Sequence, residues 1–226
     1  MYERLILLKE LLADDGCIYV HCDWHKSHYI RLLLDEIYGI NNFKNEIIWA
    51  YKSPSPTTKT FPSKHDNILR YSKGGEAKIN SDDIRISYDQ STLDRRRYSE
   101  TTKGGIGFTG KDYNEYLKGM VPADWWTDLD DDFWDDIPSG GQISRNELVG
   151  YPTQKPEKLL NRIIMASSKP NDIVFDCFMG SGTTQAVAMK LGRKFIGADI
   201  NLGAIQTTTK RLLNVAKEIN EDNDKY

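Results

Sequence analysis

The segment from residue 173 to residue 199 constrains the fold of this chain more than any other. It begins with the apolar run Ile173–Cys177, passes through a turn containing two glycines, and continues into the helical stretch Thr183–Leu191 before a second apolar run, Phe195–Asp199. Two short apolar runs separated by a helix are typical of parallel strands joined by a right-handed crossover. The pattern therefore predicts an α/β fold with a parallel sheet.

The rest of the chain divides into three stretches and a tail. Residues 1–73 and 150–219 are periodic, residues 74–149 lose periodicity and hold more acidic than basic residues, and 220–226 is expected to be a frayed tail. The other expected strands are Cys17–His21, Glu46–Tyr51 and Asn67–Tyr71. The other expected helices are an N-terminal helix that Gly16 closes, Lys26–Tyr38, Pro156–Ser168 and Leu202–Ile219.

Composition excludes several classes of protein. No stretch approaches the roughly 18 apolar residues of a membrane-spanning helix, and the charged N-terminal helical pattern is not a signal peptide. Three cysteines at no disulfide-like spacing favour a reducing cytoplasm. The net charge of −3 counts mildly against extensive duplex DNA binding, although a local basic strip would suffice.

The turn from Asp176 to Thr184 predicts a site for a nucleoside cofactor. Glycines at a strand-to-helix junction let the backbone approach a ligand, and the helix N-terminus offers free N–H groups. Asp199 ends the next strand, where a carboxylate can accept hydrogen bonds from ribose hydroxyls. An ordinary turn with packing glycines and a nicotinamide dinucleotide site are the alternatives, but the Gly-x-Gly-x-x-Gly spacing of the latter is not met.

Four motifs of this region resemble a known family. Tyr151–Leu160, Ser167-Ser168, Asp176–Thr184 and Leu191–Asp199 look like the C-terminal half of DNA adenine-N6 or cytosine-N4 methyltransferases. The resemblance is to the subgroup whose catalytic motif precedes the cofactor motif, which includes modification subunits of type III restriction systems. Gly16–His25 and Phe61–Lys73 resemble the strand after the catalytic one and the last hairpin of the sheet.

The resemblance implies a fold and a set of residue roles. The fold is a Rossmann-like S-adenosylmethionine-dependent methyltransferase sheet with permuted motif order, incomplete, and residues 74–149 form an irregular target-recognition insert. Asp199 would bind ribose, and Thr153 with Lys155 would hold the methionine end of S-adenosylmethionine. The full set of expected cofactor-binding residues is Thr153, Gln154, Lys155, Asp176, Phe178, Gly180, Gly182, Thr183 and Asp199.

The family's catalytic motif, Asp/Asn/Ser-Pro-Pro-Tyr/Phe, is absent, since no Pro-Pro pair occurs in the 226 residues. That motif accepts the hydrogens of the target amine and stacks on the base, which must leave the duplex. The expectation is a fragment, a truncated product or one part of a split enzyme, inactive alone, with two half-sheets and no catalytic residue of its own. The implied partners are DNA, an upstream segment or second chain with the motif, and a restriction subunit.

The function implied is methyl transfer from S-adenosylmethionine to adenine N6 in DNA, favoured over cytosine N4. A non-catalytic remnant that binds cofactor or DNA is the alternative, and a nicotinamide oxidoreductase is disfavoured by the glycine spacing.

Two other clusters carry weaker signals. Cysteines and histidines crowd into residues 17–28, but they lack a Cys-x-x-Cys pair and alternate between strand faces, so no metal site is expected. Arg95, Arg96 and Arg97 in the insert are candidate contacts to DNA phosphates, although short basic runs are usually solvated surface. Trp125, Trp126 and Trp134 are expected in a core or hinge rather than as stacking platforms.

Overall fold

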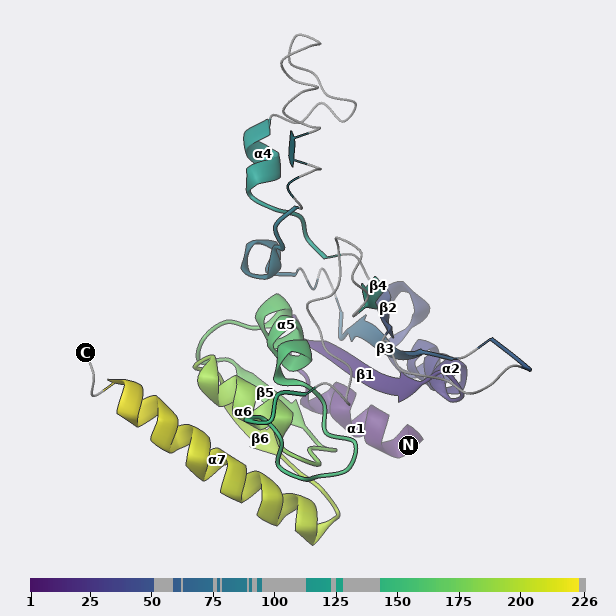
Figure 1. Cartoon of the computed structure of the whole chain (residues 1–226). Coiled ribbons are helices and arrows are strands. Elements are labelled where there is room, and N and C mark those ends of the chain that lie inside the picture. The colour runs from purple at the N-terminus through teal and green to yellow at the C-terminus, as the bar shows by residue number, and fades with distance from the viewer. Residues whose placement is uncertain are drawn as a thin grey trace. The chain divides into compact units, whose positions relative to one another are not determined.

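The computed structural model describes residues 1–50, 59–61, 63–74, 77, 79–88, 90, 93–94, 113–122, 125–127 and 143–223. These residues belong to two compact units. Unit 1 is drawn from Met1–Ala77 and Ser81–Asp135, and unit 2 from Lys78–Asn80 and Asp136–Tyr226. The elements of each unit are labelled in Figure 1. The domain boundaries expected from the sequence stay a prediction.

Unit 1 is built on a four-stranded sheet with the order β1-β3-β2-β4. β3 (His65–Ser72) lies between β1 (Cys17–Asp23) and β2 (Phe43–Ala50) and is antiparallel to both, while β4 (Trp125–Thr127) is parallel to β2. The described residues of this unit include the helices α1 (Tyr2–Leu11), α2 (Ser27–Tyr38) and the short α4 (Tyr113–Leu117), with 3-10 turns η1 (Ile40–Asn42) and η2 (Ser81–Ile84).

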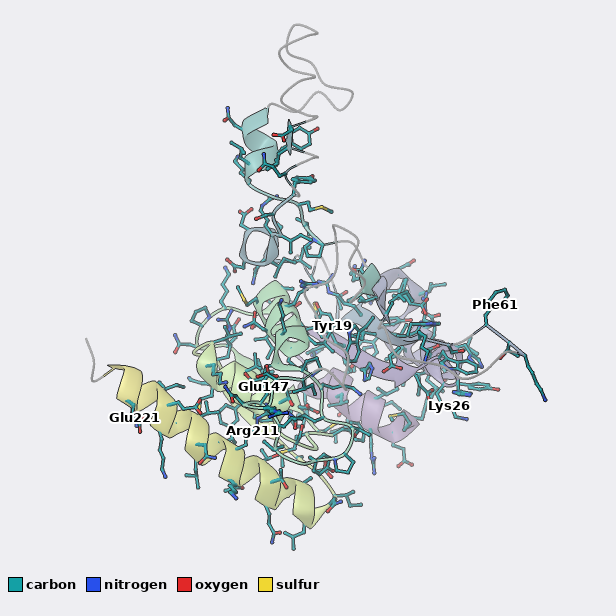
Figure 2. All side chains as sticks on the ribbon, viewed as in Figure 1. Tyr19, Lys26, Phe61, Glu147, Arg211 and Glu221 are labelled. Atoms are coloured by element: carbon teal, nitrogen blue, oxygen red, sulfur yellow. The ribbon has the colours of Figure 1, made fainter. Side chains whose placement is uncertain are left out.

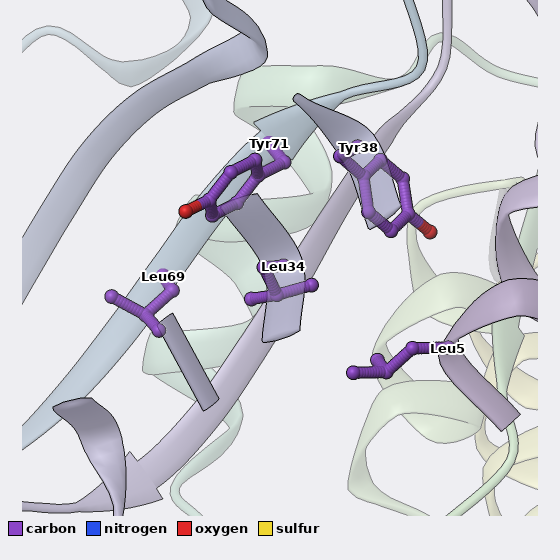
Figure 3. Packing of buried hydrophobic residues seen from close by; sticks show 5 residues of the cluster. All are labelled: Leu5, Leu34, Tyr38, Leu69 and Tyr71. Atoms are coloured by element: carbon purple, nitrogen blue, oxygen red, sulfur yellow. The ribbon is translucent and has the colours of Figure 1, made fainter. Parts of the chain in front are cut away.

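The core of unit 1 lies where α1 and α2 meet β3. Leu5, Leu34, Tyr38, Leu69 and Tyr71 are almost fully buried there, as the close view in Figure 3 shows. The phenol of Tyr71 donates a hydrogen bond of 2.6 Å to the Asp35 carboxylate, so its polar end is satisfied inside an apolar cluster. Burial raises the pKa of Tyr38 to about 12, which keeps this phenol neutral at physiological pH.

Unit 2 contains the crossover that the sequence predicted. β5 (Ile173–Asp176) and β6 (Lys194–Gly197) are parallel and paired from Ile173↔Lys194 to Asp176↔Gly197. α6 (Thr183–Lys190) connects them, and α5 (Glu157–Ser167) and α7 (Leu202–Asn223) pack against α6 (Figure 1). Ile164, Val187 and Ala188 form the core between the helices, and Val174 and Phe195 pack against it from one face of the strands.

The opposite face of β5 and β6 is apolar and exposed. Ile173 and Phe175 are two residues apart and Ile196 pairs with Phe175, so the three side chains share this face. They are 64%, 38% and 53% exposed. Among the described residues β5 pairs with β6 alone and β1 with β3 alone, so the described strands form two separate sheets.

The structure differs from the sequence-based expectation at three elements. The last helix was expected to end at Ile219, but α7 continues to Asn223; extending an existing helix gains one hydrogen bond for each residue fixed. α4 and β4 were not expected inside the non-periodic stretch. With five and three residues they are too short to show a period, and β4 is defined by its pairing with β2.

Candidate cofactor-binding site

The turn between β5 and α6 has a backbone that only glycine adopts easily. Gly180 and Gly182 have φ angles of +49° and +71°, in the left-handed region that L side chains rarely populate. Gly182 also faces α7 so closely that a Cβ atom there would lie 2.5 Å from the Thr208 methyl carbon. The amide of Gly182 donates to the Met179 carbonyl at 2.8 Å, which closes the turn. Both glycines are therefore required by geometry.

The Asp176 carboxylate holds the turn together from inside. One of its oxygens accepts a hydrogen bond of 2.9 Å from the Phe178 amide, and the other accepts one of 2.6 Å from the Thr184 hydroxyl at the start of α6. Asx-type turns of this kind fix the direction in which a chain leaves a strand. The structure thus gives Asp176 a role in shaping the turn.

Asp199 lies two residues beyond β6 and joins the two strand ends. Its carboxylate accepts hydrogen bonds from the Gly180 amide at 3.0 Å and from the Asn201 amide at 2.9 Å. The ladder between the strands also continues into the turn, because the Met179 amide donates to the Ala198 carbonyl at 3.2 Å. An ionised carboxylate has about four acceptor positions, so Asp199 keeps capacity for ligand hydroxyls.

Thr153, Gln154 and Lys155 approach the turn from the segment before α5. Thr153 has a φ angle of +64°, a strained value for a β-branched residue of the kind that clusters at functional sites. The Lys155 carbonyl accepts a hydrogen bond of 3.2 Å from the Thr183 hydroxyl, so this segment is tied to the start of α6. The structure brings the two sets of predicted residues together in unit 2.

The Gln154 side chain supports a loop from a buried position. Its amide nitrogen donates to the Glu147 carbonyl at 2.7 Å, and its oxygen accepts from the Val149 amide at 3.0 Å. A cofactor contact by Gln154 would therefore come from its backbone.

Two exposed apolar side chains follow the adjacent strand ends. Phe178, after β5, is 50% exposed, and Ile200, after β6, is 95% exposed. The sequence predicted Phe178 but missed Ile200. The sequence signal that could have identified Ile200 is an isolated apolar residue between Asp199 and Asn201. Such a residue follows the strand, so it is not needed for the core of the sheet.

A buried polar network of α5, α6 and α7 lies behind the turn, and sequence reasoning missed it. Arg211, in the interior of unit 2 in Figure 2, donates to the Ser181 carbonyl, the Thr183 hydroxyl and the Glu157 carboxylate. Lys190 donates to the second oxygen of Glu157 at 2.7 Å. Burial raises the pKa of Glu157, but hydrogen bonds and charges from Lys190 and Arg211 outweigh it, and the pKa lies below its ordinary value.

The remaining sequence-based candidates lie elsewhere. Arg95, Arg96, Arg97 and Trp134 are outside the described residues. Over the described ranges, no three His, Cys, Asp or Glu side chains are grouped to hold a metal ion. Burial, with Asp23, Asp66 and Glu46 nearby, raises the pKa of Cys22 to about 11, which disfavours the thiolate that metals require. Within the part of the chain that the structure describes, no helix has the length and apolar character needed to cross a bilayer.

A glycine turn between a parallel strand and a helix, with an acidic residue after the next strand, defines an α/β protein of the nucleoside-cofactor-binding class. Comparison with known proteins gives the family. The family model N6_N4_Mtase, described as DNA methylase, matches residues 1–210. The chain belongs to the N6/N4 DNA methylase family, which confirms the resemblance of its motifs at the level of that family.

Individual relatives agree with this assignment. The chain is 31% identical to the type II methyltransferase M.EcaI of Enterobacter cloacae, over 93% of this chain and 56% of that protein. It is 35% identical to the type II methyltransferase M1.MboII of Moraxella bovis, over 70% and 58%, and 32% identical to the DNA adenine methyltransferase YhdJ of Escherichia coli K12, over 94% and 65%. The chain thus spans between about half and two thirds of these relatives.

Solved structures match the fold. The complex of M1.HpyAVI with SAM superposes with a TM-score of 0.59 at 26% identity, covering 93% of this chain and 81% of that one. The cytosine-N4-specific PvuII DNA methyltransferase superposes with a TM-score of 0.61 at 16% identity, covering 92% and 67%, a likeness of fold alone. The α/β methyltransferase fold expected from the sequence is therefore confirmed.

Proposed function

We propose that unit 2 binds S-adenosylmethionine and that the chain serves methylation of an exocyclic amine in DNA, adenine N6 in preference to cytosine N4, within a restriction-modification system. The observation that carries the proposal is the turn itself. Gly180 and Gly182, which have no side chains and are both in the left-handed conformation, lie in this turn at the C-terminal ends of β5 and β6. There the Gly180 amide donates a hydrogen bond to the Asp199 carboxylate. When bound, S-adenosylmethionine supplies a methyl group on a positively charged sulfur.

The residues around the turn suit the parts of that cofactor. Asp199 offers a carboxylate to the ribose hydroxyls, and the exposed side chains of Phe178 and Ile200 offer apolar surface to the adenine ring. The Lys155 ammonium, two residues after the strained Thr153, would neutralise the carboxylate of the methionine end. Gly182 lets the turn lie close to Thr208 of α7 without steric conflict, and N–H groups at the start of α6 would contact the ligand.

The chain by itself is proposed to be inactive. No Pro-Pro pair occurs in its sequence, so the group that would localise the amine lone pair is not among these 226 residues. Alignment of amine, methyl and sulfur provides much of the acceleration in such reactions, and binding of cofactor alone does not supply it. The motif would come from an upstream segment or a second chain. The other proposed partners are DNA and a restriction subunit.

Calorimetry with S-adenosylmethionine and transfer of labelled methyl to DNA test the two parts separately. The chain is expected to release heat on titration with the cofactor and to transfer no label. A longer polypeptide carrying an Asp-Pro-Pro-Tyr-type strand before residue 1 is the positive control for transfer. Absence of binding would contradict the cofactor site, and turnover by the 226 residues alone would contradict the proposed inactivity.

A further inference from the structure

We propose that Arg211 of α7 is a positioning residue that holds two segments of the cofactor site, residues 153–155 and the turn 176–184, in a fixed relation. The inference rests on the proposed function, since it concerns how the S-adenosylmethionine site is kept in shape. Arg211 is a residue of the supporting helix and is 5% exposed, although arginine is almost never buried without partners.

The guanidinium of Arg211 contacts the turn on both sides of Gly182. Its Nη1 donates to the Ser181 carbonyl at 3.2 Å and to the Thr183 hydroxyl oxygen at 2.9 Å. Hydrogen bonds from a charged donor are about twice as strong as neutral ones. The two contacts bracket Gly182, the residue with the larger positive φ angle of the turn.

The Thr183 hydroxyl passes this constraint to the other segment. It has one proton, which it donates to the Lys155 carbonyl at 3.2 Å. Its oxygen therefore accepts from Arg211, and in the 3.0 Å contact with the Ser181 hydroxyl it must also be the acceptor. One hydroxyl thus joins the guanidinium, the turn and the backbone that precedes α5.

Glu157 balances the buried charge of Arg211. The distance from Arg211 Nη2 to Glu157 Oε1 is 2.8 Å, and Glu157 lies in the first turn of α5, two residues after Lys155. Arg211 therefore contacts α5 with one nitrogen and the turn with another, which the planar fork of arginine allows and the single ammonium of lysine does not.

Thr208, one helical turn before Arg211, adds a contact from the same face of α7. Its hydroxyl donates to the Gly180 carbonyl at 3.1 Å, and its side chain fills the space beside Gly182. α7 thus holds Gly180 through Thr208, and Ser181 and Thr183 through Arg211. The outer side of the turn is left to the ligand.

The test compares R211M and R211K with R193M as a matched control. Arg193 also makes three hydrogen bonds inside unit 2, two to Ser168 and one to the Leu191 carbonyl, but none to the cofactor segments. R211M is expected to raise the Kd for S-adenosylmethionine about tenfold, measured by calorimetry at a temperature where every variant is folded. R211K should fall between wild type and R211M, and R193M should bind like wild type.

Hydrogen exchange on the ligand-free chain tests, without the cofactor, whether Arg211 holds the two segments in place. In R211M, amides of residues 153–155 and 178–184 should lose protection while those of β5 keep it. Unchanged exchange, an unchanged Kd, or equal weakening by R211M and R193M would each overturn the proposal. If the wild type fails to bind S-adenosylmethionine, the proposed function is wrong and Arg211 has no role toward the cofactor. The exchange data would then still show whether Arg211 holds the two segments together.

Discussion

Substitution of Gly182 by alanine is expected to be far more damaging than the same change at Gly192. Both glycines have a φ angle of +71°, so each alanine carries the cost of a left-handed backbone, about 1–2 kcal/mol. A Cβ at Gly192 meets nothing within 4 Å, whereas one at Gly182 meets Thr208 at 2.5, 2.6 and 2.9 Å. Forcing extra atoms into a packed site costs about 1–3 kcal/mol more. G192A should therefore lose about 1–2 kcal/mol, and G182A about 2–5 kcal/mol.

Urea unfolding followed by circular dichroism measures both losses, and a double-mutant cycle isolates the contact. T208A removes two of the three clashing atoms, so G182A should cost less in the T208A background than in wild type. Calorimetry on folded G182A is expected to show weaker S-adenosylmethionine binding, because the turn must move away from α7 or relax its φ angle. If G182A is no less stable than G192A, the close approach of α7 to the turn does not govern this site.

Three further predictions follow from the polar contacts. The pKa of Glu157 is lowered on folding, so the unfolded chain takes up the proton first; the resulting stability is present above the ordinary value of 4.5 and is lost as the pH falls through the folded-state pKa. E157Q should lower the free energy of unfolding near pH 7 by about 2 kcal/mol, and it should make that free energy depend less on pH in the acid range. An unchanged pH dependence, measured by chemical unfolding, would count against the ion pairs of Glu157. D199N places an amide nitrogen where the Gly180 or Asn201 amide now donates, and it should weaken S-adenosylmethionine binding about tenfold in calorimetry, with D172N, which changes a carboxylate outside the site, as control; equal affinities would remove Asp199 from the site. Y71F removes the hydrogen bond to Asp35 and should cost about 1 kcal/mol on urea unfolding without altering cofactor affinity, whereas altered affinity would show that this core contact reaches the site.

Much of the cofactor-binding unit could be read from local patterns. The strands Ile173–Cys177 and Phe195–Asp199 and the helix from Thr183 were placed within a few residues, because apolar periodicity and glycine position are local properties of a sequence. The sequence also indicated which residues surround the turn. Their roles toward the cofactor stay predictions, except that Asp176 and Gln154 have structural partners that their positions along the chain did not reveal.

Contacts between distant parts of the sequence could not be read in the same way. β4 exists by pairing with β2 across more than seventy positions, and three residues carry no period of their own. The exposure of Ile200 depends on which parts of the folded chain lie around it, and the local sequence does not specify them. The same holds for the exposed face of β5 and β6, whose residues read as an ordinary buried strand pattern.

The sequence by itself determined the family, the parallel strand pair and the glycine turn, because each depends on residues that are neighbours or nearly so along the chain. The tertiary structure alone decided what supports the turn. Arg211 is 54 positions from Glu157 and 28 from Thr183, and an arginine in an amphipathic helix is ordinarily a solvated residue. Folding brings these groups to within 3 Å of one another, and burial then makes their hydrogen bonds obligatory.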